Sequence, residues 1–229
     1  MNQQLYLHEQ LLLLILRDEK GTALPVEYTL ALAGGLMAEL FLAERIRIED
    51  NKKKRVLWRD STGMDDALLN ECLETIRRSK KPKPVEEWIQ RFSEIKGLKN
   101  RIADTLVQTG ILSRKSRKIL GLFKQQIYPL QVREVEAEIV SGMQKAIRGE
   151  RADVEPRTAL LISLADVTGL LRYHFDRKEL KNRKERIKQI TEGELLGESI
   201  KAIEAIQAAI ITGAAAAGAI AATTAATSS

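Results

Sequence analysis

The residues best suited to chemistry in this sequence are cations, gathered in a window that contains no acid. Between Thr105 and Arg133 there is no Asp or Glu. The basic residues of the window are Arg114, Lys115, Arg117, Lys118, Lys124 and Arg133, and most of them flank the apolar residues Leu120, Leu122 and Phe123. We interpret residues 111–130 as a hairpin with an apolar tip and basic flanks.

Such a hairpin fits three roles. Apolar tip residues can enter a bilayer interface while the cations meet anionic headgroups, at about 1 kcal/mol for each cation near the surface. The same tip can form a contact between protomers through Leu120, Leu122 and Phe123, and this role is compatible with the first. The third role is protection alone, because Lys and Arg on an edge strand discourage pairing with other chains.

A second group of cations precedes this window. Lys96 and Lys99 lie three residues apart and would share a face of a helix, with Arg101 nearby. We predict that these three residues bind a phosphate-bearing headgroup, although a plain solvated helix face gives the same pattern. Lysine is a point charge without the fork geometry of Arg, so low selectivity among headgroups is expected.

Signals for catalysis are weak. His8 and His174 are the only histidines, and each is interpreted as a capping residue or a residue at the edge of the core. No Cys and His residues have metal-ligand spacing, Gly34-Gly35 does not follow a strand, and the carboxylates are scattered along the sequence. We therefore expect a protein that is not an enzyme and uses neither metal nor cofactor.

Composition places the chain among ordinary globular proteins. Its 229 residues are 44% hydrophobic, 30% charged and 4% aromatic, with a formal net charge of +6. The single cysteine, Cys72, is expected to be buried in a helix and excludes an intrachain disulfide, which favours a reducing compartment. The apolar run 11–16 is too short to span a bilayer and lacks the flanks of a signal peptide.

Periodicity predicts a mainly α fold, a single compact multi-helix domain with one or two small β-hairpins, one of them projecting. The domain is expected over residues 1–212, followed by a disordered Ala/Gly/Thr/Ser tail over 213–229. Helices are predicted at 5–16, 28–43, 65–78, 85–92, 97–108, 130–148, 157–175, 176–190 and 194–212, with a break near Gly169 inside 157–175, and a first hairpin at 45–58.

The order of several segments resembles the Golgi phosphoprotein domain. These segments are Leu11–Asp18 with Gly21, Ala33–Leu40, Arg45–Ile48, Asp65–Leu73, Trp88-Ile89, Leu106–Leu112, Pro129 and Leu160–Ala165. No single motif is diagnostic, and the specificity lies in their order and spacing over residues 5–212. The resemblance implies a helical domain with a projecting hairpin. It also implies an adaptor that binds phosphatidylinositol 4-phosphate and the cytosolic tails of Golgi membrane enzymes.

The resemblance also assigns positions to the lipid site. The family's aromatic position falls on Leu24 and its first basic position on Ala33, neither of which matches. Its later basic pair falls on Lys96 and Lys99, where charge is kept. We therefore expect a peripheral membrane protein of the cytoplasm, on the cytosolic face of the Golgi in a eukaryote, that is able to form homo-oligomers.

Two other functions compete with the membrane adaptor. One is a structural oligomer without a ligand. The other is nucleic-acid binding, because helices followed by a basic hairpin, as in residues 85–130, can imitate a winged helix. The predicted helix at 97–108 carries few side chains able to read bases, so nucleic acid is the weaker alternative.

Overall fold

The structure is a computed structural model that describes residues 4–17, 20–119, 123–150, 153–192 and 204–213. It confirms a mainly helical fold with two small antiparallel sheets. The helices are α1 (Leu7–Ile15), α2 (Tyr28–Leu42), α3 (Ala67–Arg77), α4 (Val85–Ser93), α5 (Leu98–Gln108), α6 (Arg133–Arg148), α7 (Pro156–Val167), α8 (Leu171–His174), α9 (Arg177–Asn182) and α10 (Lys184–Thr191). A further helical segment covers residues 204–213.

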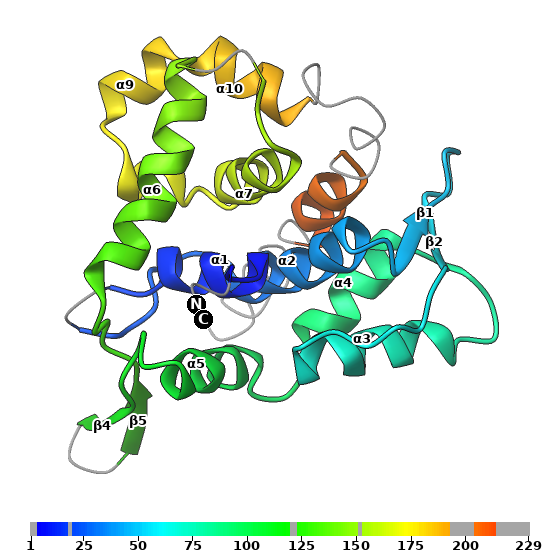
Figure 1. Ribbon diagram of the computed structural model, residues 1–229, viewed down its shortest axis with the longest axis horizontal. Coiled ribbons are helices and arrows are strands. Elements are labelled where there is room, and N and C mark those ends of the chain that lie inside the picture. Colours follow the sequence, from blue (N-terminus) through cyan, green and yellow to red (C-terminus); the bar gives the residue numbers. More distant parts are fainter. Residues whose placement is uncertain (1–3, 18–19, 120–122, 151–152, 193–203, 214–229) are drawn as a thin grey trace, which may run out of the picture.

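Helices α1 and α2 form the centre of the molecule. Figure 1 shows them side by side, with α6, α7 and α10 on one side and α3, α4 and α5 on the other. Both helices are apolar on nearly every face, so burial on all sides is their most stable environment. A Cβ atom at Gly35 would lie 3.0 Å from the backbone of His8, so α1 and α2 approach each other closely at this glycine.

The first sheet has three strands, β1 (Ile46–Ile48), β2 (Arg55–Trp58) and β3 (Lys83–Pro84). β1 and β2 are the predicted hairpin, with Ile46 opposite Trp58. β3 was not predicted, because two residues before a proline-capped helix give no strand signal. It pairs antiparallel to β2, with Val56 opposite Lys83, and so fixes the segment before α4 on the sheet.

The predicted break near Gly169 in the segment 157–175 is confirmed, and the predicted helix over 176–190 is interrupted as well. Gly169 has φ +72° and ends the first helical stretch just after α7, after which the short α8 forms. Arg183 separates α9 from α10. The predicted helix at 194–212 is described only over 204–213, and residues 214–229 of the predicted tail lie outside the described part of the chain.

Candidate functional site

The second predicted hairpin is present as β4 (Lys115–Ile119) and β5 (Phe123–Ile127). The strands pair antiparallel, and Figure 1 shows them extending away from the helical body below α5. Leu120 and Leu122 lie outside the described residues, as does the side chain of Phe123. The structure therefore describes the two strands of the predicted hairpin, and its apolar tip stays a prediction.

The root of the hairpin is fixed on α5 and on the turn after α1. Arg114 forms an ion pair with Asp104 of α5. Tyr128, which is 1% exposed, directs its hydroxyl to the same carboxylate, and burial together with this negative charge raises the pKa of Tyr128. Its backbone N–H donates to the carbonyl oxygen of Gly21 at 2.9 Å. The two strands thus leave the body from a rigid base.

Lys99 lies against this base. Its Nζ is 6.0 Å from the centre of the Tyr128 ring, and burial lowers the pKa of Lys99 below its ordinary value. No carboxylate pairs with Lys99 in the described part of the chain. A half-buried cation without a counter-ion is unfavourable, because removing a charge from water is compensated only by a partner. An anion bound at this point would supply that partner.

The expected grouping of Lys96, Lys99 and Arg101 needs correction. Helix α5 begins at Leu98, because Gly97 adopts a left-handed conformation with φ +69°, so Lys96 lies in the preceding turn and shares no helix face with Lys99. Arg101 points away from Lys99 and binds Glu71 of α3 at 2.6 Å. Lys99 is the residue of the three that the structure brings to the hairpin root.

The cations of the strands remain open to solvent. Lys115, Arg117, Lys118 and Lys124 are all exposed. The register places Lys118 directly opposite Lys124, while Arg117 donates to the side chain of Gln125 at 3.0 Å. No ion pair neutralises these four residues within the described chain, whereas Arg114 is neutralised at the root. The hairpin therefore presents a dense positive surface.

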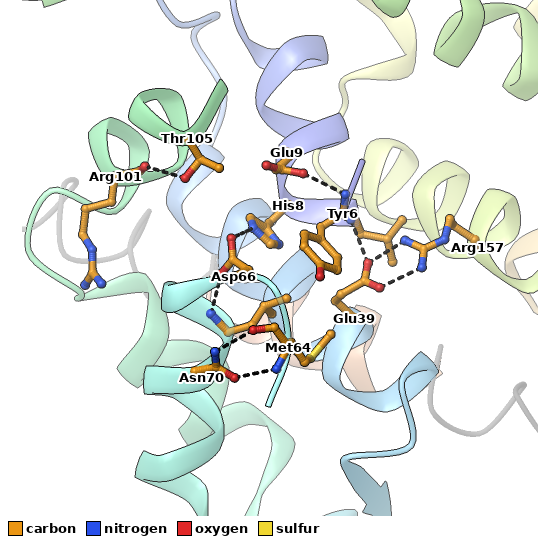
Figure 2. Close-up of polar contacts among 12 residues, drawn as sticks. Tyr6, His8, Glu9, Glu39, Met64, Asp66, Asn70, Arg101, Thr105 and Arg157 are labelled. Carbon is orange, nitrogen blue, oxygen red and sulfur yellow. Dashed lines mark hydrogen bonds and ion pairs between the residues drawn. The ribbon is translucent and has the colours of Figure 1, made fainter. Parts of the chain in front are cut away.

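A buried polar cluster at the head of α1 was missed by sequence analysis. Figure 2 shows Glu39 of α2 accepting two hydrogen bonds from Arg157 of α7, at 2.6 and 2.7 Å, and a third from the backbone of Leu7 at 2.9 Å. Nearby, His8 lies 3.4 Å from Asp66, and both side chains are almost fully buried. The carboxylates of Glu39 and Asp66 are therefore internal, which their scattered places in the sequence did not indicate.

The charges of this cluster are matched by local partners. Burial alone would raise the pKa of Asp66, but hydrogen bonds from His8 and from the backbone N–H of Leu69 lower it. Because Asp66 caps α3 and Glu39 holds α7, the cluster fastens three elements to the head of α1. No signal in a single sequence would have paired Glu39 with Arg157, 118 residues apart.

A cleft of about 420 Å³ opens beside this cluster, between α6, α7 and the start of α1. Its wall on α6 carries the half-buried Val135 and Ile139 and the exposed Glu138. Arg157 also lines the cleft, but its guanidinium is bound to Glu39, so Glu138 and Glu155 determine the local charge. The cleft is therefore apolar and acidic, the opposite of the hairpin.

The arrangement of a helical body around two apolar helices, with a projecting hairpin, agrees with a family comparison. The family model of Golgi phosphoprotein 3 (GPP34) matches residues 7–209. The chain belongs to this family. The match covers the described helical domain from α1 into the segment 204–213, and it confirms the resemblance inferred from the order of the motifs.

Two further observations concern membranes and metals. None of the helices in the described part of the chain combines the length and apolarity needed to cross a membrane. Among those same residues, no group of three or more His, Cys, Asp or Glu side chains could hold a metal ion. The positions that the family resemblance assigns to its aromatic and first basic residue, Leu24 and Ala33, are buried.

Proposed function

We propose that this chain is a peripheral membrane adaptor that binds anionic phospholipid headgroups at the root of the β4–β5 hairpin. Lys99 provides the headgroup contact and the exposed cations of the hairpin provide the surface contact. This role needs neither catalysis nor a cofactor. For a eukaryotic cell we propose that the adaptor acts on the cytosolic face of the Golgi, which membership of the family supports.

The observation that carries the proposal is the half-buried, unpaired ammonium of Lys99. Its Nζ lies 6.0 Å from the centre of the Tyr128 ring, and Tyr128 is held by Asp104 and Gly21, so the ammonium faces a fixed part of the hairpin root. A phosphate bound there gains a charge-assisted contact and relieves the desolvated cation. Membership of the Golgi phosphoprotein family supports a lipid as the source of that phosphate.

The hairpin supports the same conclusion through its like charges. Directly opposed like charges destabilise an antiparallel pair, and Lys118 faces Lys124. An anionic surface would turn this repulsion into attraction, at about 1 kcal/mol for each cation near the bilayer. Leu120 and Leu122 lie between the two strands in sequence and Phe123 begins β5, and all three are proposed to enter the interface.

Selectivity among headgroups is proposed to be low. Leu24 and Ala33 are buried apolar residues, so they add no polar contact to Lys99. Arg101 is engaged by Glu71, and Lys96 is an exposed residue of a turn. No free Arg guanidinium is present at Lys99 among the described residues to make a bidentate contact with phosphate. Affinity should therefore depend on the net negative charge of the headgroup and not on the positions of its phosphates.

An adaptor also needs a protein partner, and the α6–α7 cleft has the chemistry for one. Glu138 and Glu155 form no ion pairs within the described residues, and they lie beside the apolar Val135 and Ile139. A cytosolic tail with an apolar side chain next to Lys or Arg would complement both features. We propose that such tails bind in this cleft.

Vesicle co-sedimentation tests the lipid site. We expect binding to phosphatidylcholine vesicles that contain phosphatidylserine or phosphatidylinositol 4-phosphate, and none to phosphatidylcholine alone. Raising the salt concentration should weaken binding, because surface charge interactions are screened. Equal binding to neutral and anionic vesicles would overturn the proposal, and retention of DNA without vesicle binding would favour the winged-helix alternative.

The cleft is tested by filling it. A Cβ atom at Gly142 has no neighbour within 4 Å, so Gly142→Met places a side chain in the cleft without disturbing the fold. We expect this variant to lose binding to an immobilised basic tail peptide and to keep vesicle binding. Gly142→Ala, which leaves the cleft open, is the control and should bind both.

A further inference from the structure

A second cleft lies on the opposite part of the molecule from the hairpin, beside the three-stranded sheet. It has a volume of about 210 Å³ and lies between β2, the loop that follows α3, and α4. This volume is below the range of about 300–1,000 Å³ that is typical of small-molecule pockets. It is suited to one inserted side chain rather than a whole ligand.

The floor and walls of this cleft are aromatic and apolar. Val56, Ile76 and Trp88 are buried beneath it, and Pro82 closes one side. Trp58 stands at the end of β2 on the same side of the strand as Val56, but it is 45% exposed. Trp58 therefore leaves nearly half of its surface uncovered beside the cleft, and a partly exposed Trp is typical of contact surfaces.

One polar group of this region is also unsatisfied. The indole N–H of Trp88 is buried and has no hydrogen-bond partner. Buried donors without partners are uncommon, since each forfeits about 1–3 kcal/mol. The loop that closes the cleft is ordered by hydrogen bonds, including one from the Ser79 hydroxyl to the carbonyl oxygen of Lys81 at 2.8 Å.

The rim of the cleft is strongly positive. Lys80 and Lys81 are exposed and unpaired within the described chain, and Arg77 and Arg78 share the single carboxylate of Glu74. Among the acids of the neighbouring elements, Glu87 pairs with Lys83 and Asp60 with Arg45, whereas the exposed Glu86 of α4 forms no ion pair within the described residues. An excess of cations therefore surrounds an apolar floor.

From this juxtaposition we propose that the cleft between β2, α3 and α4 is a docking site for an acidic peptide segment of a partner protein. One aromatic or proline side chain of the segment stacks on Trp58 and enters the cleft, while flanking Asp or Glu residues pair with Lys80 and Lys81. The site is separate from the lipid site and from the α6–α7 cleft, and it does not depend on either.

The same features favour a peptide over a phosphorylated headgroup. A headgroup is polar on every side and would leave Trp58, Val56 and Ile76 without complementary contacts. An acidic peptide with an apolar anchor satisfies both the floor and the rim. Because the rim is positively charged, the complementary partner segment carries negative charge.

Selection from a phage-displayed library of random peptides tests this site. Wild-type protein is the bait, and Lys80→Glu with Lys81→Glu is used for counter-selection. We expect enriched peptides with an aromatic or proline residue beside Asp or Glu. Absence of enrichment, or enrichment of basic peptides, would overturn the proposal.

Tryptophan fluorescence then locates the binding. The chain has two tryptophans, and only Trp58 is accessible to acrylamide because Trp88 is 1% exposed. The most enriched synthetic peptide should protect Trp58 from quenching in the wild type. It should bind the double Glu variant at least about tenfold more weakly, since each reversal turns attraction at the rim into repulsion.

A matched control separates local from overall charge. Lys52→Glu with Lys53→Glu makes the same change in net charge at the exposed β1–β2 turn, away from Trp58, and should leave peptide binding unchanged. Equal loss in both double variants would refute the site. Protection of Trp58 by phosphatidylserine vesicles but not by the peptide would assign this surface to the membrane and would equally overturn the proposal.

Discussion

Lys118 and Lys124 face each other directly across the β4–β5 ladder, and both side chains are exposed. A hairpin selected for its own stability would place an acid at one of these positions, because opposite charges stabilise a cross-strand pair and like charges weaken it. The pair therefore supports the proposal that the hairpin contacts negative charge.

Lys118→Glu should separate hairpin stability from membrane binding. The substitution converts the repulsive pair into an attractive one, so the thermal midpoint should stay the same or rise slightly. Vesicle binding should fall roughly 10- to 30-fold, because the reversal removes two units of charge from the surface. Differential scanning fluorimetry and co-sedimentation with phosphatidylserine vesicles provide the two readouts, and tighter vesicle binding by the variant would contradict the prediction.

Gly21→Ala should destabilise the protein more than Gly110→Ala. Both glycines have a positive φ, +57° and +76°, where alanine costs roughly 1–2 kcal/mol. A Cβ atom at Gly21 would also lie 2.4 Å from the backbone of Tyr128 and Pro129, whereas at Gly110 it would have no neighbour within 4 Å. Urea unfolding measures the difference between the two variants. Equal losses would mean that the turn does not support the hairpin root.

Arg157→Met should be one of the more damaging single changes in the molecule. It leaves the Glu39 carboxylate, whose side chain is 3% exposed, without its charged partner. Loss of one partner of a buried ion pair typically costs about 3–5 kcal/mol. The double variant Glu39→Gln, Arg157→Met keeps an acceptor for the Leu7 N–H and should recover part of this loss in chemical unfolding. A double variant no more stable than Arg157→Met would contradict the account.

Glu9 should make stability depend on pH in a defined direction. Burial raises the pKa of Glu9, against the lowering effect of the hydrogen bond from the Tyr6 N–H. The folded protein therefore holds this proton more tightly than the unfolded chain, and the stability it contributes is lost as pH rises above about 4.5. Glu9→Gln keeps an acceptor and should gain stability relative to the wild type as pH rises from that value to neutrality. A constant difference between the two proteins would refute this.

Much of the fold follows from the sequence because its signals are local. The apolar α1 and α2, the alternation in β1 and β2, and the acid-free β4–β5 segment each carry their own pattern, and each element forms where that pattern predicts. Single residues set the deviations. Gly97 delays the start of α5 to Leu98, so Lys96 lies outside the helix, and Arg183 divides the predicted helix over 176–190 into α9 and α10.

The candidate site was less predictable, because its properties depend on contacts between distant segments. Lys99 was predicted as one of three cations in the lipid site. Its burial near Tyr128 and the ion pair of Arg101 with Glu71 arise from tertiary packing, which the sequence pattern does not contain. The Glu39–Arg157 pair and the pairing of β3 with β2 are tertiary features of the same kind. Periodicity predicts which face of a helix is buried, but it does not predict which other element packs against that face.

The central claim is that the unpaired ammonium of Lys99 binds an anionic headgroup, and Lys99→Met tests it most directly. Methionine keeps the length and apolar stem of the side chain and removes a desolvated charge, so the fold should be at least as stable as the wild type. Binding to phosphatidylinositol 4-phosphate vesicles should fall about tenfold, since each cation at the headgroup contributes about 1 kcal/mol or more. The control variant Lys52→Met, at the β1–β2 turn, should bind these vesicles as the wild type does. Wild-type affinity in Lys99→Met, or an equal loss in Lys52→Met, would contradict the assignment.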